Sequence, residues 1–230
     1  MGKRLRTQRR GRGCPHYRSP SHRHVDDVRL PHVENGTGTI RDLIQAPGRT
    51  SPLAVIEFNG KTDYQLAVEG TKVGQKVTIG TNAIVAGNIT TLDKIPEGTL
   101  IHNVEGTPGD GGKYAKTAGS SATVVSRGNR VVLLMPSGQM KEFHPDCRAV
   151  IGVVAGGGRG DKPLAKAGKN ALTLRSRSVA NKVVSGVAMN AVDHPHGGGS
   201  HPHVGGPNCQ RRTASTGQKV GFLPKKKRKV

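Results

Sequence analysis

Positive charge is concentrated at the two ends of this 230-residue chain, which limits how much of it can fold into a globule. Residues 1–24 contain eight lysines and arginines and no acidic residue, and residues 159–230 contain fifteen against two aspartates. Residues 25–158 contain thirteen basic and thirteen acidic residues. Because like charges repel until a polyanion neutralises them, we predict a neutral folded body between two extended cationic arms that bind a polyanion.

The composition supports this division. Only 33% of the residues are hydrophobic and 3% are aromatic, which is too little for one core throughout the chain. Few aromatic rings also means few platforms for stacking unpaired bases, so shape and backbone recognition of folded RNA, or non-specific duplex binding, is favoured. No apolar run reaches the length of a membrane span, so we expect no membrane partner. Three widely spaced cysteines indicate a reducing compartment rather than a disulfide framework.

The body is predicted to be mainly β. Short β-branched runs separated by glycine and asparagine predict a small antiparallel barrel, with strands over 39–46, 53–58, 63–68, 76–80 and 99–104. In a second set of strands, Gly128-Asn129 separates two apolar runs within 122–135, which predicts a hairpin with a two-residue loop. Further strands are predicted over 139–143 and 148–156, and no regular structure before residue 25 or after Gly158.

Two glycine-rich stretches match a phosphate-binding loop poorly. Residues 107–114 begin with Thr107 where the loop needs glycine, and end with Tyr114 where it needs serine or threonine. Residues 155–162 end in Asp161-Lys162 without the glycine, lysine and hydroxyl residue in succession. Neither is predicted to open a helix, so a nucleotide-hydrolysing enzyme is not expected.

The histidines and cysteines leave two alternatives open. One set comprises Cys14, His16, His22 and His24, and a second comprises His194, His196, His201, His203 and Cys209. Four such ligands can hold a tetrahedral zinc ion, although the spacings match no common zinc pattern. With the tail PKKKRKV (224–230), which is identical to a nuclear import signal, this gives the alternative of a zinc-stabilised nuclear DNA-binding protein. Asp193-His194 could form a carboxylate–imidazole pair in a nuclease, but no nucleophile accompanies it.

A set of longer motifs resembles the universal large-subunit ribosomal protein two, in its archaeal form. The resemblance runs nearly end to end, through QRRGRG (8–13), SPSHRH (19–24), PEGT (96–99), PGDGGK (108–113), PSG (136–138), RAVIGVVAGGGR (148–159), DKP (161–163), KAG (166–168) and GVAMNAVDHPHGGG (186–199). The last motif is highly specific, and Ala191 favours the archaeal branch. The chain departs from the family pattern in VANKVVSG (179–186), which lacks tryptophan and arginine, in SHPH (200–203) and at Gln218.

The resemblance implies a fold and a function. The fold is an oligonucleotide-binding-type barrel (37–105) followed by an SH3-like barrel (106–158), with basic arms at 1–36 and 159–230. The function is that of a structural, non-enzymatic protein of the cytoplasmic ribosome. Such a protein binds large-subunit ribosomal RNA, contacts other ribosomal proteins, and supports the peptidyl-transferase region, subunit association and transfer-RNA binding.

The implied RNA-binding residues lie in both arms. They are Gln8, Arg9, Arg10, Gly11, Arg12 and Gly13 in the first arm, and Met189, Asn190, Asp193, His194, Pro195, His196, Gly197, Gly198 and Gly199 in the second. We expect no catalytic residue, no metal ligand and no intrinsic cofactor, only Mg²⁺ held by the bound RNA. The acid in this set, Asp193, is expected to accept hydrogen bonds from base amino groups or from hydrated Mg²⁺.

Overall fold

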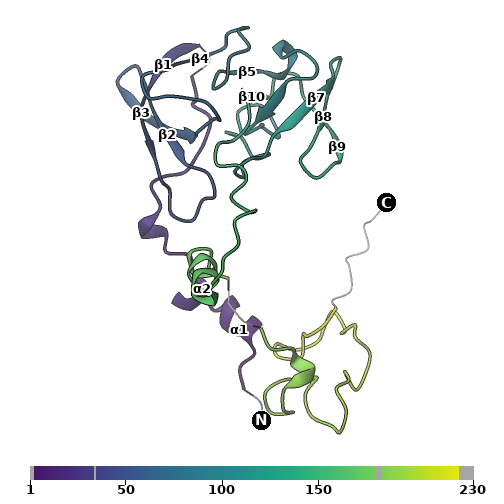
Figure 1. Cartoon of the computed structure of the whole chain (residues 1–230). Coiled ribbons are helices and arrows are strands. Elements are labelled where there is room, and N and C mark those ends of the chain that lie inside the picture. The colour runs from purple at the N-terminus through teal and green to yellow at the C-terminus, as the bar shows by residue number, and fades with distance from the viewer. Residues whose placement is uncertain (1–2, 34, 180–182, 223–230) are drawn as a thin grey trace. The chain divides into compact units, whose positions relative to one another are not determined.

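The computed structural model describes residues 3–33, 35–179 and 183–222, and its contacts divide the chain into two units (Figure 1). The barrel unit is His22–Pro163. The arm unit combines Met1–Ser21 with Leu164–Val230, and described residues of the two arms contact each other, as Lys3 and Asp193 do.

The barrel unit contains ten strands in one hydrogen-bonded sheet, which confirms the prediction of a mainly β fold. The strands are β1 (Gly36–Ile44), β2 (Leu53–Phe58), β3 (Lys61–Leu66), β4 (Lys76–Ile79), β5 (Ile89–Thr91), β6 (Leu100–His102), β7 (Ala122–Ser126), β8 (Val131–Leu134), β9 (Met140–Phe143) and β10 (Arg148–Ile151). Their order in the sheet is β3-β2-β1-β4-β5-β10-β6-β7-β8-β9. All pairs are antiparallel except β4 and β5, which are parallel.

Two large hydrophobic cores lie within this sheet. Inward-facing residues of β1, β2 and β4 form the first core, which includes Ile40, Ile56 and Val77. Residues of β7, β8 and β9 form the second, which includes Val124 and Leu133. The strand β10 pairs with β5 on one side and β6 on the other, so it joins the two sets of strands. Figure 1 shows β10 beside β5.

The two cores do not follow each other simply along the sequence. Leu92, Ile95 and Ile101 precede the glycine-rich connector, yet they pack in the second core with strands that follow it. Val150, near the end of the second strand set, packs in the first core. Each core therefore contains residues from both sets of strands, and β10, which pairs with β5 and β6, makes the sheet continuous. The boundary at residues 105 and 106 stays a prediction.

Part of the segment that we assigned to the N-terminal arm packs in the barrel unit. Val28 and Leu30 are 3% and 1% exposed. The Leu30 amide donates to the Gly111 carbonyl at 2.9 Å, and Lys116 Nζ donates to the Val28 carbonyl at 2.8 Å. Two buried apolar side chains and these hydrogen bonds together hold this segment on the barrels.

The prediction of no regular structure in the arms was wrong at two places. Helix α1 spans Arg6–Gly11 and helix α2 spans Ala167–Ser176. Gln8 stabilises the start of α1, where its Oε1 accepts the Leu5 amide at 2.8 Å, and Gly13 ends this region with φ +72°. Helix α2 buries none of its residues, so the sequence lacks the apolar periodicity that would have predicted it. Among the described residues, 3₁₀ turns lie at Pro15–Tyr17, Ser21–Arg23, Leu92–Lys94 and Gly186–Ala188.

Two details of the strands also differ from the prediction. The β7–β8 hairpin is present, but four residues, 127–130, separate its strands, because the register shifts between Val124 and Ser126. The short strand β5 was not predicted, since three residues give no readable alternation. No helix in the described part of the chain is long and apolar enough to span a membrane.

Candidate nucleic-acid interface

The glycine–histidine loop, residues 186–199, folds into consecutive tight turns. The Asp193 amide donates to the Asn190 carbonyl at 2.9 Å, and the Gly197 amide donates to the His194 carbonyl at 2.9 Å. The Gly198 amide then reaches back to the Met189 carbonyl at 3.0 Å and closes the loop. The backbone of this segment is therefore arranged by its own hydrogen bonds.

Two glycines allow the loop to close. A Cβ atom on Gly197 would lie 2.3 Å from the Asn190 carbonyl oxygen and 2.5 Å from that of Met189. A Cβ atom on Gly186 would lie 2.3 Å from atoms of the His194 ring. Since real Cβ atoms do not approach other atoms this closely, a side chain at position 197 would have to displace the backbone, and one at position 186 would have to displace the His194 ring. The Gly–His composition thus sets the shape of the loop.

The hydrogen bond at His194 fixes its tautomer. The backbone amide of His196 donates to His194 Nδ1 at 3.0 Å, so Nδ1 is the acceptor and the proton of the neutral ring lies on Nε2. The rings of His194 and His196 meet edge to face, with centroids 5.0 Å apart. Burial, and then the neighbouring His196, lowers the pKa of His194. With Nδ1 as the acceptor, the neutral ring keeps one donor, the N–H group at Nε2.

The carboxylate of Asp193 has a partner within the protein. Its Oδ1 lies 2.8 Å from Lys3 Nζ, and the Lys3 amide donates to the Val192 carbonyl at 3.1 Å. The start of the N-terminal arm is thus attached to the loop at two points. Because Asp193 pairs with Lys3 and His194 Nδ1 faces the His196 amide, these neighbours do not form a carboxylate–imidazole pair.

The structure brings only part of the predicted site together. Gln8, Asp193, His194 and Pro195 line one cavity of about 360 Å³ in the arm unit. Lys3, Arg4, Leu5, Thr216 and Gly217 also line this cavity and were not singled out from the sequence, where only the basic character of Lys3-Arg4 was a signal.

The remaining predicted site residues lie outside this cavity. Arg9, Arg10, Gly11 and Arg12 are exposed and Gly13 is half-buried, and the Arg10 guanidinium lies 5.9 Å from the centre of the Tyr17 ring. In the loop, Asn190 and Gly199 are exposed, while Met189, His196, Gly197 and Gly198 are half-buried. The exposed arginines and the loop are both accessible to a large polyanion.

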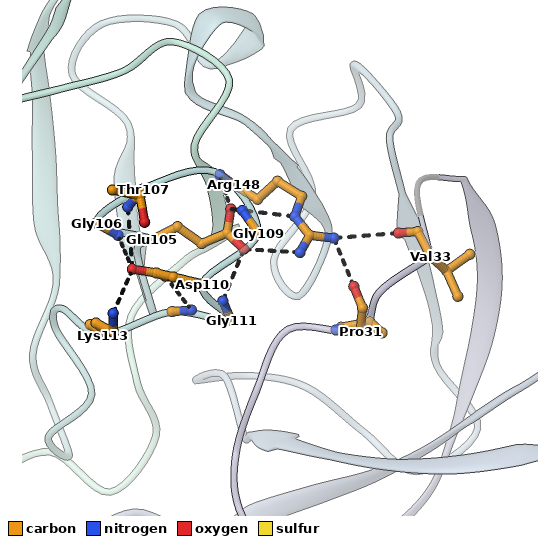
Figure 2. Close-up of polar contacts among 11 residues, drawn as sticks. Pro31, Val33, Glu105, Gly106, Thr107, Gly109, Asp110, Gly111, Lys113 and Arg148 are labelled. Carbon is orange, nitrogen blue, oxygen red and sulfur yellow. Dashed lines mark hydrogen bonds and ion pairs between the residues drawn. The ribbon is translucent and has the colours of Figure 1, made fainter.

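The glycine-rich segment 105–113 in the barrel unit is closed around two carboxylates (Figure 2). Asp110 accepts the amides of Gly106 at 2.9 Å, Thr107 at 3.2 Å and Gly112 at 3.1 Å. Lys113 Nζ lies 3.1 Å from the same side chain. The amides that a phosphate-binding loop would offer to a nucleotide are therefore used by the protein itself, in agreement with the poor motif match.

Glu105, the first residue of this segment, forms a buried pair with Arg148 (Figure 2). Arg148 Nη2 lies 2.9 Å from Glu105 Oε1, and the Arg148 amide donates to Oε2 at 2.9 Å. Arg148 Nη1 donates onward to the Pro31 carbonyl at 2.7 Å. Burial alone would raise the pKa of Glu105, but the hydrogen bonds and charge of Arg148 outweigh it and hold that pKa below its ordinary value. This pair fastens the N-terminal segment to the second core.

Among the described residues, no group of three or more histidine, cysteine or acidic side chains is placed to hold a metal ion. All three cysteines are free: Cys147 is buried, Cys14 is half-buried and Cys209 is exposed. The tail PKKKRKV lies outside the described residues, so the structure gives it no conformation.

The fold and the candidate site together define a class of protein. It has a mainly β body and cationic, glycine-rich arms, and backbone hydrogen bonds determine the conformation of the loop 186–199. The model of the family described as Ribosomal Proteins L2, C-terminal domain, matches residues 85–218. This chain belongs to that family, which confirms the resemblance seen in the sequence.

Three relatives are similar over nearly the whole chain, and each is named Large ribosomal subunit protein uL2. The relative from Thermoplasma acidophilum is 49% identical over 232 residues, which cover 100% of this chain and 99% of that protein. The relative from Picrophilus torridus is 48% identical, with 100% and 98% covered. The relative from Archaeoglobus fulgidus is 48% identical, with 97% and 96% covered. These archaeal relatives support the assignment to the archaeal form.

Proposed function

We propose that this protein is a structural constituent of the large ribosomal subunit, in the cytoplasm, and that its arms bind ribosomal RNA. The observation that carries the proposal is similarity along the whole chain to proteins named as large-subunit proteins. The charge distribution supports it, because residues 1–24 and 159–230 hold the entire excess of positive charge. Phosphates of RNA neutralise such arms and so stabilise them in the bound state.

The glycine–histidine loop supplies short-range contacts in this proposal. Glycines let the RNA backbone approach the protein backbone, while the side chain of Asn190 and the Nε2–H of His194 offer hydrogen bonds to phosphates, sugars or base edges. The loop thereby supports the peptidyl-transferase region, where RNA performs the chemistry and the protein contributes no catalytic group. The proposal also includes a role in subunit association and transfer-RNA binding, and contacts with other ribosomal proteins.

No intrinsic cofactor is part of the proposal. Mg²⁺ ions belong to the bound RNA, whose phosphates attract them. Since Asp193 is paired with Lys3, its role is to position the N-terminal arm on the loop. Because Lys3 pairs with Oδ1, a hydrated Mg²⁺ ion held by the RNA would bind Asp193 through its other carboxylate oxygen.

The test compares binding of the full chain to three nucleic acids at equal salt concentration: large-subunit RNA, small-subunit RNA and duplex DNA. We expect large-subunit RNA to bind at least about tenfold more tightly than either competitor, which corresponds to about 1.4 kcal/mol. Binding of all three with the same affinity and salt dependence would contradict the proposal, because charge alone would then account for it.

A further inference from the structure

The strand β9 is an edge of the ten-stranded sheet, since among the described residues it pairs with β8 alone. In the turn before it, the Met135 amide donates to the Gln139 carbonyl at 2.9 Å. Hydrogen-bonded and non-hydrogen-bonded pairs alternate along an antiparallel ladder, so Met140 and Glu142 lie in non-hydrogen-bonded pairs with β8. Their backbone N–H and C=O groups therefore point away from β8, toward the open edge.

An apolar row crosses the sheet and ends at this edge. Leu100 of β6 and Leu134 of β8 both lie opposite Thr123 of β7. Leu134 also lies opposite Met140 of β9. Because the preceding residue, Leu133, packs in the second core, the row lies on the outer face. Leu100, Leu134 and Met140 are 43%, 37% and 68% exposed. An exposed apolar row at an open strand edge is typical of a site that another chain covers.

The outer face of these strands carries little charge, in contrast to the arms. The strands β6, β7, β8 and β9 contain a single lysine or arginine, Lys141. Its ammonium lies 4.1 Å from the centre of the Tyr114 ring and 5.4 Å from that of Phe143, so it lies on the side of the second core. Glu142, the next residue, is exposed on the outer face. A face with a carboxylate and no cation does not attract RNA phosphates, which favours a protein partner.

We propose that β9 pairs with an extended segment of a second protein of the large subunit, which adds a strand to the sheet. An extended polypeptide supplies N–H and C=O groups at the spacing that the edge requires. The partner residue beside Met140 is apolar and continues the row. The partner residue beside Glu142 is a lysine or arginine, two positions away, because residues i and i+2 of a strand share a face.

This inference rests on the proposed function, since the large subunit supplies the second protein. The first test uses large subunits assembled with the full chain, in which a photo-reactive phenylalanine analogue replaces Met140. We expect a cross-link to one segment of another large-subunit protein, with an apolar and a basic residue two positions apart. A cross-link to RNA or to a second copy of this chain, or no cross-link, would overturn the inference.

The second test measures amide hydrogen exchange at β9 in the free chain and in assembled large subunits. The amides of Met140 and Glu142 should exchange at least about tenfold more slowly in the subunits, because a partner strand accepts their hydrogen bonds. The Lys141 amide is the internal reference, since the same alternation pairs it with Leu133 in both states. Equal exchange of the two outward amides in both states would exclude an added strand.

A variant and a matched control connect this protection to the apolar row. Met140→Lys places a charge at the end of the row and should abolish the protection of the Glu142 amide in the subunits. Val73→Lys makes the same kind of change at another exposed apolar residue of the barrel unit, which is 58% exposed, and should leave that protection unchanged. Slow exchange of the Lys141 amide in both variants shows that the β8–β9 ladder is intact.

Equal effects of the two substitutions on the Glu142 amide would contradict the role of the apolar row. Failure of the unaltered chain to enter large subunits would instead overturn the proposed function. A chain that enters them with the β9 amides still exchanging freely would overturn this inference alone.

Discussion

Gly197 and Gly186 show how single residues determine the shape of the glycine–histidine loop. Each lies where a Cβ atom would be about 2.3 Å from a neighbour, a carbonyl oxygen for Gly197 and an imidazole for Gly186. The Asn190 carbonyl accepts the amides of Asp193 and His194, and the Met189 carbonyl, 2.5 Å from the same Cβ position, accepts that of Gly198, so neither carbonyl can move without disturbing these hydrogen bonds. A methyl group at position 197 therefore acts on the backbone of the whole loop.

Gly197→Ala should open the loop and reduce the affinity for large-subunit RNA at least about tenfold, or about 1.4 kcal/mol. Amide hydrogen exchange of residues 186–199 in the RNA complex should increase at the same time. Gly206→Ala is the matched control in the same arm, because a Cβ atom there has no neighbour within 4 Å. Equal behaviour of the two variants would show that the close contact at position 197 does not matter.

His102 makes the stability of the barrels depend on pH. Burial lowers its pKa from 6.5 to about 4, against the opposing effect of the hydrogen bond between Nδ1 and the Gly152 carbonyl. Since the pKa of this histidine is higher in the unfolded state than in the folded state, protonation favours unfolding. The protein is therefore most stable above the unfolded-state pKa and loses stability as the pH falls below it. The unfolding free energy should decrease by about 3 kcal/mol between pH 6.5 and pH 4.

Chemical denaturation of the full chain at several pH values measures this effect. In His102→Asn the decrease above pH 4.5 should disappear, since the amide keeps a donor near Gly152 but does not titrate. Because the pKa of Glu105 is lowered, its contribution to the unfolding free energy is lost at lower pH, where this carboxylate becomes protonated. A variant whose pH dependence equals that of the unaltered chain would remove His102 as the cause.

At the scale of elements, the buried pair of Glu105 and Arg148 joins β10, the glycine-rich segment and residues 31–33. The Glu105 side chain is fully buried and that of Arg148 is 15% exposed, so neither charge is solvated by bulk water. Loss of one partner leaves the other charge buried and unpaired, which costs far more than loss of a surface pair.

Glu105→Gln should lower the unfolding free energy by about 3–5 kcal/mol, measured by urea denaturation of the full chain. The matched control is Glu57→Gln, which breaks the exposed pair of Glu57 and Arg41 and should cost less than about 1 kcal/mol. If the two substitutions cost the same, the buried pair would not be what fastens these elements together.

The elements differ in how well the sequence predicts them. Strands such as β2, whose burial alternates along LAVIEF, and β8, in VVLL, carry their pattern in neighbouring residues, so they were predicted well. Helices α1 and α2 bury no residue, and β5 is only three residues long. Their sequences therefore show no hydrophobic periodicity that could predict them. In the site, the motifs identified the loop, but the contact of Lys3 with Asp193 joins residues from opposite ends of the chain. Such contacts depend on the tertiary fold, and local sequence patterns do not contain them.

At the scale of the molecule, charge and hydrophobic residues are separated along the sequence. The central 134 residues are neutral and supply both large hydrophobic cores, while the ends hold the net charge of +21. A protein with this distribution has a stable body and arms whose interaction with RNA depends strongly on salt. The exposed arginines of the first arm should contribute directly to that dependence.

Arg9→Ala with Arg10→Ala should flatten the salt dependence of RNA binding by about two units of slope, because two phosphate contacts are lost. Binding is measured with large-subunit RNA over a series of salt concentrations. Arg127→Ala with Arg130→Ala removes the same charge from the barrel unit and should change the slope less. An unchanged slope in the arm variant would show that these arginines do not contact phosphates.

A cryo-electron microscopy map of the large ribosomal subunit from the source organism tests most directly whether the arms bind ribosomal RNA. The account predicts that residues 3–21 and 164–222 lie along RNA, with arginines of the first arm at phosphates and His194 Nε2 within hydrogen-bonding distance of an RNA acceptor. Arms that extend into solvent, or that contact only protein while the barrels alone touch RNA, would contradict it.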